Sequence, residues 1–188
     1  MRLRSVAIAA LVAGLSAPCQ SRAENLEKYA PNRYGVMALA GSSYNPSGTN
    51  FWQVGGVAML DYDKVWRHWA PDGMRFKIEG CVGATMASEP RAVVSLDAFA
   101  LQYLDLISSE RVRPYVEAGI GGIYTDFQVE GQGSRVNFNP TLGVGLEFPC
   151  KDKRSLFVSV RLHHLSNAGL CDENRGVNSG VLAVGWLY

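Results

Sequence analysis

Segments in which apolar and polar side chains alternate run through this chain from about residue 33 to its end, and they constrain its fold more than any other feature. A period of two is the pattern of a β-strand whose two faces meet different surroundings. Turn-forming connectors separate the segments, and no helical period of useful length competes with the alternation. We interpret eight segments as strands: 33–43, 51–61, 74–87, 92–104, 113–125, 136–148, 155–167 and 178–188.

The length of these segments indicates which kind of β-protein they form. Each is longer than ten residues, whereas strands in globular proteins commonly have about 5–6 residues. A strand that crosses a membrane needs about 9–11 residues, and an even number of such strands leaves both termini on the same side of the membrane. The sequence therefore predicts an all-β fold, an eight-stranded antiparallel transmembrane β-barrel. A soluble β-sandwich is the alternative.

The two faces of the predicted strands favour lipid outside and polar groups inside. In segment 136–148 one face carries Val136, Phe138, Leu142, Val144, Leu146 and Phe148, and the other carries Asn137, Asn139, Thr141, Gly143, Gly145 and Glu147. The last segment aligns Leu182, Val184, Trp186 and Tyr188 on one face, as expected for a strand that ends in an interfacial aromatic girdle. Isolated buried charges are costly, so we expect five inward-facing charges to pair: Lys77, Asp97, Glu117, Glu147 and Arg161.

The first residues have the pattern of a secretory signal peptide. Two arginines precede an apolar core over residues 6–17, and small residues occupy the recognition positions that end at Ala23. We predict cleavage after Ala23, which leaves residues 24–188 as an outer-membrane barrel domain. A lipoprotein cut before Cys19 is the alternative, and Pro18 argues against it.

Charge and cysteine content exclude several other classes of protein. The formal net charge of +1 suggests neither a nucleic-acid binder nor an acidic tail. After the N-terminal segment no apolar run is long enough for a membrane helix. The cysteines that follow the predicted cut, Cys81, Cys150 and Cys171, form neither an even disulfide set nor a metal-binding spacing, so we expect them to be unpaired. Cys150 and Cys171 would lie at opposite ends of one strand, too far apart for a disulfide.

One short motif carries chemistry. His164 and Ser166 are two residues apart on a predicted strand, so they share a face with Cα atoms about 6.5–7 Å apart. An adjacent imidazole can activate a serine hydroxyl as a nucleophile. Their face is the apolar one that also carries Leu162, and Asn178 has the matching parity on the next strand. We therefore expect all three on the outer wall, next to lipid. His163 points inward.

The segment that begins with this motif resembles the PagL-type family of lipid A 3-O-deacylases. The matching residues are 164–169, His-Leu-Ser-Asn-Ala-Gly, followed by Asn174 and Gly176, with weaker support from 113–119 and 139–148. The resemblance implies a metal-independent serine esterase, without cofactor, that hydrolyses the 3-position acyl ester of lipid A in the outer leaflet.

The resemblance also implies roles for individual residues. Ser166 would be the nucleophile, His164 the general base, and Asn178 the residue that orients the imidazole. Gly169, Asn174 and Asn167 would supply donors to the oxyanion or the substrate. The oligomeric state, monomer or homodimer, is left open.

Asn178 departs from the family pattern, which has a glutamate there. An amide can orient a histidine but cannot neutralise an imidazolium. Three outcomes stay open: Asn178 serves, Asp172 or Glu173 replaces it, or the enzyme is weak or inactive. Two other functions also stay open, a non-catalytic structural barrel and an esterase for another membrane lipid.

Overall fold

The structure is a computed structural model that describes residues 32–66, 70–71 and 73–188. The predicted signal peptide, residues 1–23, lies outside the described residues. Among the residues that are described, no helix is long and apolar enough to cross a membrane. The strands are β1 (Arg33–Asn45), β2 (Ser47–Asp61), β3 (Met74–Thr85), β4 (Ala92–Tyr103), β5 (Arg113–Thr125), β6 (Val136–Phe138), β7 (Thr141–Pro149), β8 (Ser155–Leu165) and β9 (Val177–Leu187). Three helical turns connect strands: α2 (Tyr62–Trp66), η2 (Asp105–Ile107) and η3 (Lys151–Lys153).

The strands form a closed antiparallel barrel, which confirms the predicted fold. Each strand pairs with its neighbours, and the sheet closes on itself because β1 pairs with β9 and β4 pairs with β5. Both β6 and β7 pair with β5, so together they fill one of eight strand positions. The predicted strand 136–148 is thus interrupted at Asn139 and Pro140, because proline has no N–H to donate to the ladder. The first hairpin is longer than predicted, with β1 reaching Asn45 and β2 starting at Ser47.

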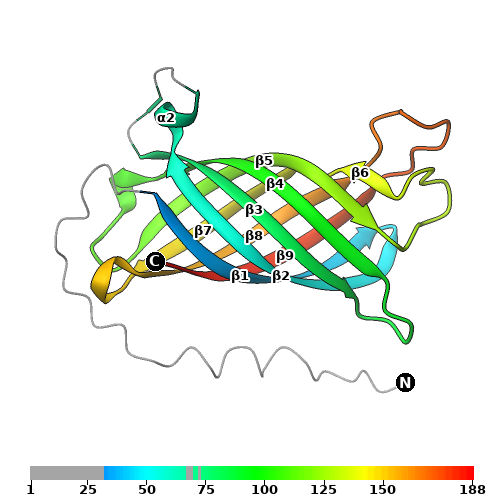
Figure 1. Ribbon diagram of the computed structural model, residues 1–188, viewed down its shortest axis with the longest axis horizontal. Helices are drawn as coiled ribbons and strands as arrows, with labels where there is room; N and C mark the ends of the chain where they lie inside the picture. Colours follow the sequence, from blue (N-terminus) through cyan, green and yellow to red (C-terminus); the bar gives the residue numbers. More distant parts are fainter. Residues whose placement is uncertain (1–31, 67–69, 72) are drawn as a thin grey trace.

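The two ends of the barrel differ in what they carry (Figure 1). β1 begins and β9 ends at one end, and α2 lies at this same end. The opposite end, which we call the loop end, carries the connections over residues 86–91, 126–135 and 166–176. β1 begins and β9 ends at the same end because the number of strand positions is even and each antiparallel strand reverses the direction of the chain.

The outer wall of the barrel is apolar, as the alternation predicts. Its exposed side chains come from every part of the sheet and include Val36, Val82, Leu96, Ile120, Leu142, Val144, Val160 and Leu162. Exposed aromatic side chains lie towards both ends, among them Tyr34, Tyr44, Trp52, Trp186 and Tyr188. A belt of this kind suits contact with lipid rather than with water.

Buried ion pairs hold the interior together. Arg161 donates from both Nη atoms to the Glu79 carboxylate at 2.7 Å and from Nε to Glu117 at 2.8 Å. Lys77 Nζ lies 2.9 Å from Glu79 and also contacts Glu117. All four side chains are fully buried. Because each charge faces two opposite charges, the cluster satisfies the predicted requirement that these groups pair.

The other two predicted inward charges also have partners. Arg33 lies 2.6 Å from Glu147, whose carboxylate also accepts a hydrogen bond from the Tyr103 hydroxyl. Asp97 accepts a hydrogen bond from Asn139 Nδ2 at 2.5 Å, so its partner is an amide rather than a cation.

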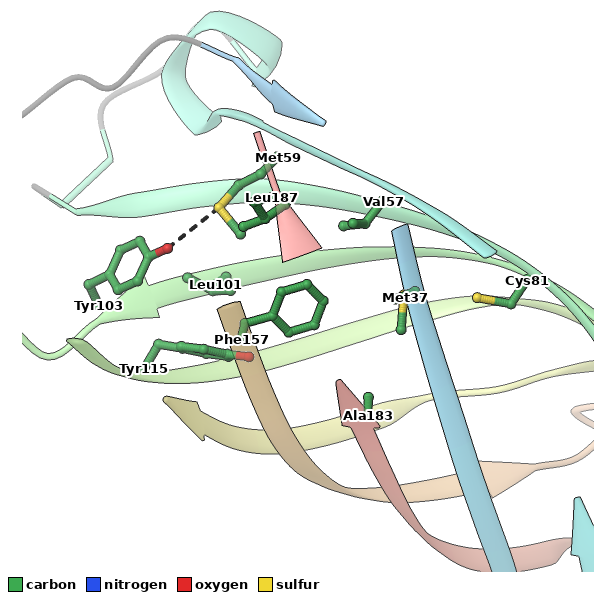
Figure 2. Packing of buried hydrophobic residues seen from close by; sticks show 10 residues of the cluster. All are labelled: Met37, Val57, Met59, Cys81, Leu101, Tyr103, Tyr115, Phe157, Ala183 and Leu187. Carbon is green, nitrogen blue, oxygen red and sulfur yellow. Dashed lines mark hydrogen bonds between the residues drawn. The ribbon is translucent and has the colours of Figure 1, made fainter. Parts of the chain in front are cut away.

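The interior is less polar than the sequence suggested. Figure 2 shows a cluster of buried side chains within the barrel: Met37, Val57, Met59, Cys81, Leu101, Tyr103, Tyr115, Phe157, Ala183 and Leu187. Several rings pack over glycines on the neighbouring strand, in the pairs Gly41–Phe51, Gly119–Phe99, Gly145–Tyr115 and Gly185–Phe157, where a Cβ on the glycine would lie 2.2–2.4 Å from the ring. The lumen is therefore filled by side chains and offers no open channel.

The cysteines follow the prediction only in part. Cys81 is a buried free thiol and Cys171 an exposed one. Cys150 is disulfide-bonded, so the expectation of an unpaired cysteine is wrong at this position.

Candidate active site

His164 and Asn178 face each other across two neighbouring strands near the loop end. They are direct partners in the register of β8 and β9. His164 Nδ1 lies 2.7 Å from Asn178 Oδ1, and both side chains are half-buried. Their strands expose Leu162 and Leu182 on the same face. The two residues therefore lie on the outer wall, where the sequence placed them.

This contact selects one tautomer of the neutral imidazole. An amide oxygen can only accept a hydrogen bond, so Nδ1 of His164 carries the proton that it donates to Asn178. In the neutral ring of this tautomer, Nε2 is the nitrogen that can accept a proton, as a general base requires.

Ser166 follows β8 and is held by its backbone. Its N–H donates to Phe138 O at 3.0 Å, and its carbonyl accepts from Phe138 N at 2.8 Å. The side chain is half-buried and shares the outward parity of His164. Within the described part of the chain the Ser166 hydroxyl makes no hydrogen bond. The hydrogen bond between a nucleophile and its base is often long in a free enzyme and shortens only when substrate binds.

The chain reverses directly after Ser166. Leu170 N donates to Asn167 O at 3.1 Å across a turn whose central residues, Ala168 and Gly169, have φ of 55° and 79°. Positive φ at both central positions defines a type I′ turn, which is unusual for an alanine. The turn leads the chain away from the strand directly after the serine.

Asn167 joins two loops instead of lying free. Its side chain is buried, and its Nδ2 donates to Gln132 O at 2.9 Å and to Glu173 O at 2.7 Å. Its Oδ1 accepts from Gly169 N at 3.0 Å, and its own N–H donates to Asn174 Oδ1 at 2.9 Å. The donors of Asn167 and the N–H of Gly169, to which the resemblance gave a role towards the oxyanion or the substrate, are thus engaged within the loops.

Two other hydrogen-bond donors in the loop after Ser166 are not engaged in this way. Among the described residues, neither the N–H of Ala168 nor the Nδ2 of Asn174 has a hydrogen-bond partner. Sequence reasoning missed Ala168, although its place two residues after the serine could have suggested it.

A groove on the outer wall adjoins the site. It has a volume of about 280 Å³, and Tyr44, Leu142, Leu162, His164 and Asn178 contribute to its lining. The apolar members of this set lie on the lipid side of His164, so the groove joins the outer apolar belt.

The remaining charged and titratable candidates lie elsewhere. The exposed loop residues Asp172 and Glu173 do not contact His164 in the described structure. The His163 ring faces inward and lies 6.2 Å from the Phe51 ring, as expected. Across the described residues, no group of three or more His, Cys, Asp and Glu side chains could hold a metal ion.

Two arginines at the loop end share one carboxylate. Arg135 lies 2.9 Å and Arg91 3.6 Å from Asp126, and both arginines are about half exposed.

Comparison with known proteins adds a family and two structures. A family model described as lipid A 3-O-deacylase (PagL) matches residues 34–186. The lipid A deacylase PagL of Pseudomonas aeruginosa is 35% identical over 85 residues, which cover 44% of this chain and 47% of that relative, so the chain matches about half the length of this curated protein. The crystal structure of the outer membrane enzyme PagL superposes with a TM-score of 0.59 and 26% identity over 80% of this chain and 97% of the other. Neisserial surface protein A has a TM-score of 0.58 at 16% identity over 83% and 94% of the two chains, which shows a shared fold alone.

Proposed function

Since the chain belongs to the lipid A 3-O-deacylase family, we propose that it is an outer-membrane esterase that removes the acyl chain at the 3-position of lipid A. The observation that carries this proposal is the hydrogen bond between His164 and Asn178 on the outer wall, beside Ser166. A base and a nucleophile on that surface can reach only a substrate that lies in or at the bilayer. Lipid A, whose acyl chains lie in the outer leaflet, has this property.

The reaction that we propose is acyl transfer through serine. Ser166 Oγ attacks the ester carbonyl while His164 Nε2 takes the hydroxyl proton. The tetrahedral intermediate collapses, the C–O bond to the sugar breaks, and His164 returns the proton to the sugar oxygen. A water molecule then attacks the acyl-enzyme with the same base, which releases the fatty acid and restores Ser166.

Asn178 would hold the imidazole for these proton transfers. Its Oδ1 fixes the Nδ1–H tautomer, so Nε2 stays available to the serine. It carries no charge to stabilise the imidazolium that forms during the attack. We therefore expect a working enzyme with lower turnover than one with a carboxylate at this position.

The oxyanion would be met by donors in the loop after Ser166. Those free to do so are the Ala168 N–H and Asn174 Nδ2, while Asn167 and Gly169 hold the loop in shape. Donors placed in advance of the reaction contribute much of the rate enhancement in acyl transfer, and loss of one costs about 10²–10³-fold in kcat.

Mass spectrometry of lipid A from cells that express the protein would test the proposal. Wild-type protein should remove one 3-position hydroxyacyl chain, and Ser166→Ala should not. Ser109→Ala, an exposed serine in the turn after η2 at the other end of the barrel, is the matched control and should behave as wild type. Unchanged lipid A with folded wild-type protein would favour a non-catalytic barrel. Release of fatty acid from glycerophospholipids alone would favour an esterase for another lipid.

The homodimer that the sequence left open is a separate prediction. Chemical cross-linking in membranes would test it.

A further inference from the structure

Gly176 lies directly before β9, and the imidazole of His164 occupies the space where a side chain would begin. A Cβ at position 176 would lie 2.5 Å from Cε1 and 3.1 Å from Nε2 of His164, and 3.2 Å from Leu165 O. Carbon atoms in contact normally lie about 3.5–4.0 Å apart. The α-carbon of Gly176 therefore packs directly against the Cε1–Nε2 edge of the ring.

The backbone alone does not require glycine at this position. Gly133 and Gly169 in the neighbouring loops have φ of 78° and 79°, in the region that other residues rarely adopt. Gly176 is not among the residues with positive φ. An alanine could adopt its backbone conformation, so the main obstacle is the histidine ring, whose Cε1 would lie closer to the added Cβ than Leu165 O does.

The ring is thus bounded on two sides. Asn178 holds Nδ1 by a hydrogen bond, and Gly176 limits the adjoining Cε1–Nε2 edge by contact. In the β8–β9 register Leu165 pairs with Val177, so Ser166 and Gly176 are the next residue of each chain towards the loop end. The ring edge that Gly176 touches includes Nε2, the nitrogen that would take the proton of Ser166.

We propose that Gly176 is a positioning residue for His164, which lets the imidazole lie flat enough against β9 for Nε2 to reach Ser166. The inference rests on the proposed function and concerns how the base is placed. A methyl group at position 176 would move the ring by about 1 Å to restore normal contacts. A misplacement of that size can cost about 10²-fold in rate.

The experiment compares Gly176→Ala with two matched glycines. At Gly122 and Gly180, both in strands, an added Cβ would meet nothing within 4 Å. Each purified variant is first checked for folding by its migration in SDS gels with and without heating. Two quantities are then measured: kcat and KM for a soluble ester, and the rate at which a fluorophosphonate reagent modifies Ser166.

We expect Gly176→Ala to lower kcat and the fluorophosphonate rate about 10²-fold with little change in KM. Gly122→Ala and Gly180→Ala should stay within about twofold of wild type in kcat. A merely structural defect would lower the yield of folded protein and leave the folded fraction fully active. Kinetic constants for Gly176→Ala within twofold of wild type would overturn the proposal, as would an equal loss in Gly122→Ala.

NMR of the histidine rings tests the inference independently of activity. The chain has three histidines, so the ring signals of labelled protein can be assigned by substitution. Gly176→Ala should shift the Cε1–H signal of His164 and leave that of His163 in place, whereas Gly122→Ala should shift neither. An unmoved His164 signal would refute the contact even if the wild-type protein had no esterase activity. An inactive wild type in which the signal does shift would refute the proposed function and support the contact.

Discussion

Substitution of Asn178 by aspartate tests the weakest point of the proposed machinery. Aspartate has the shape of asparagine, so one carboxylate oxygen should keep the 2.7 Å contact with His164 Nδ1. It adds the negative charge that an imidazolium needs in the transition state. Two unit charges about 4 Å apart attract by about 1 kcal/mol in water and about 4 kcal/mol at an effective dielectric constant of 20. Because both side chains are half-buried, the gain should lie between these values. At about 1.4 kcal/mol per factor of ten, we expect kcat to rise between about fivefold and about 700-fold.

The assay is the release of fatty acid from lipid A in detergent micelles, with kcat and KM separated. Asn178→Leu, which removes the acceptor, should lower kcat below that of wild type. Substitution of both loop acids, Asp172→Asn with Glu173→Gln, should leave kcat unchanged, since neither contacts the histidine. An Asn178→Asp variant that folds but turns over no faster than wild type would show that position 178 does not act on the imidazole. A loss of activity in the loop-acid variant would point to one of those carboxylates instead.

Three further predictions concern the scaffold and its loops. Val144 lies on the exposed outer wall of β7, and a cation near the bilayer midplane is costly, so Val144→Arg should destabilise the barrel by about 2–4 kcal/mol relative to Val144→Ala. Urea unfolding in vesicles measures this difference, and equal stabilities would contradict a lipid-facing wall. Arg161→Met leaves Glu79 and Glu117 to share Lys77 alone and should cost about 3–5 kcal/mol in the same assay, and a neutral result would mean that the buried pairs do not stabilise the fold. Asn167→Ala should speed amide hydrogen exchange in both loops that it joins, whereas exchange rates equal to wild type would show that it does not hold them together.

Alternation was enough to predict the barrel but not the composition of its interior. The period of two assigns each side chain to a face, and the charge pairs follow from that assignment because charges such as Arg161 need partners inside. It fails where both faces are apolar. In β4, Val94 and Leu96 face outward while Phe99 and Leu101 face inward, so hydrophobicity alone does not show that the lumen holds an apolar cluster.

The candidate site was predictable as far as it depends on strand register. His164 and Asn178 share a parity on adjacent strands, and their contact follows once β8 and β9 pair. The contact between Asn167 and Gln132 was not predictable, because it joins residues 35 positions apart whose meeting depends on the shapes of two loops. For the same reason, the family resemblance, which assigned Asn167 and Gly169 to the oxyanion or the substrate, could not show that their polar groups bind within the loops.

The filled lumen determines how substrate and water reach this site. The barrel interior is occupied by the glycine–aromatic pairs and by the buried ion pairs that Lys77 and Arg161 form with two glutamates. Neither a lipid nor a stream of water can therefore pass through it. In the proposed reaction, an acyl chain would therefore enter sideways along the outer wall, where the groove at Leu142 and Leu162 joins the apolar belt. Water for the second half of the proposed reaction would then come from the loop end, past the turn that follows Ser166. In the proposed reaction, the loops that Asn167 joins at that end would therefore bound the path of water as well as shape the site.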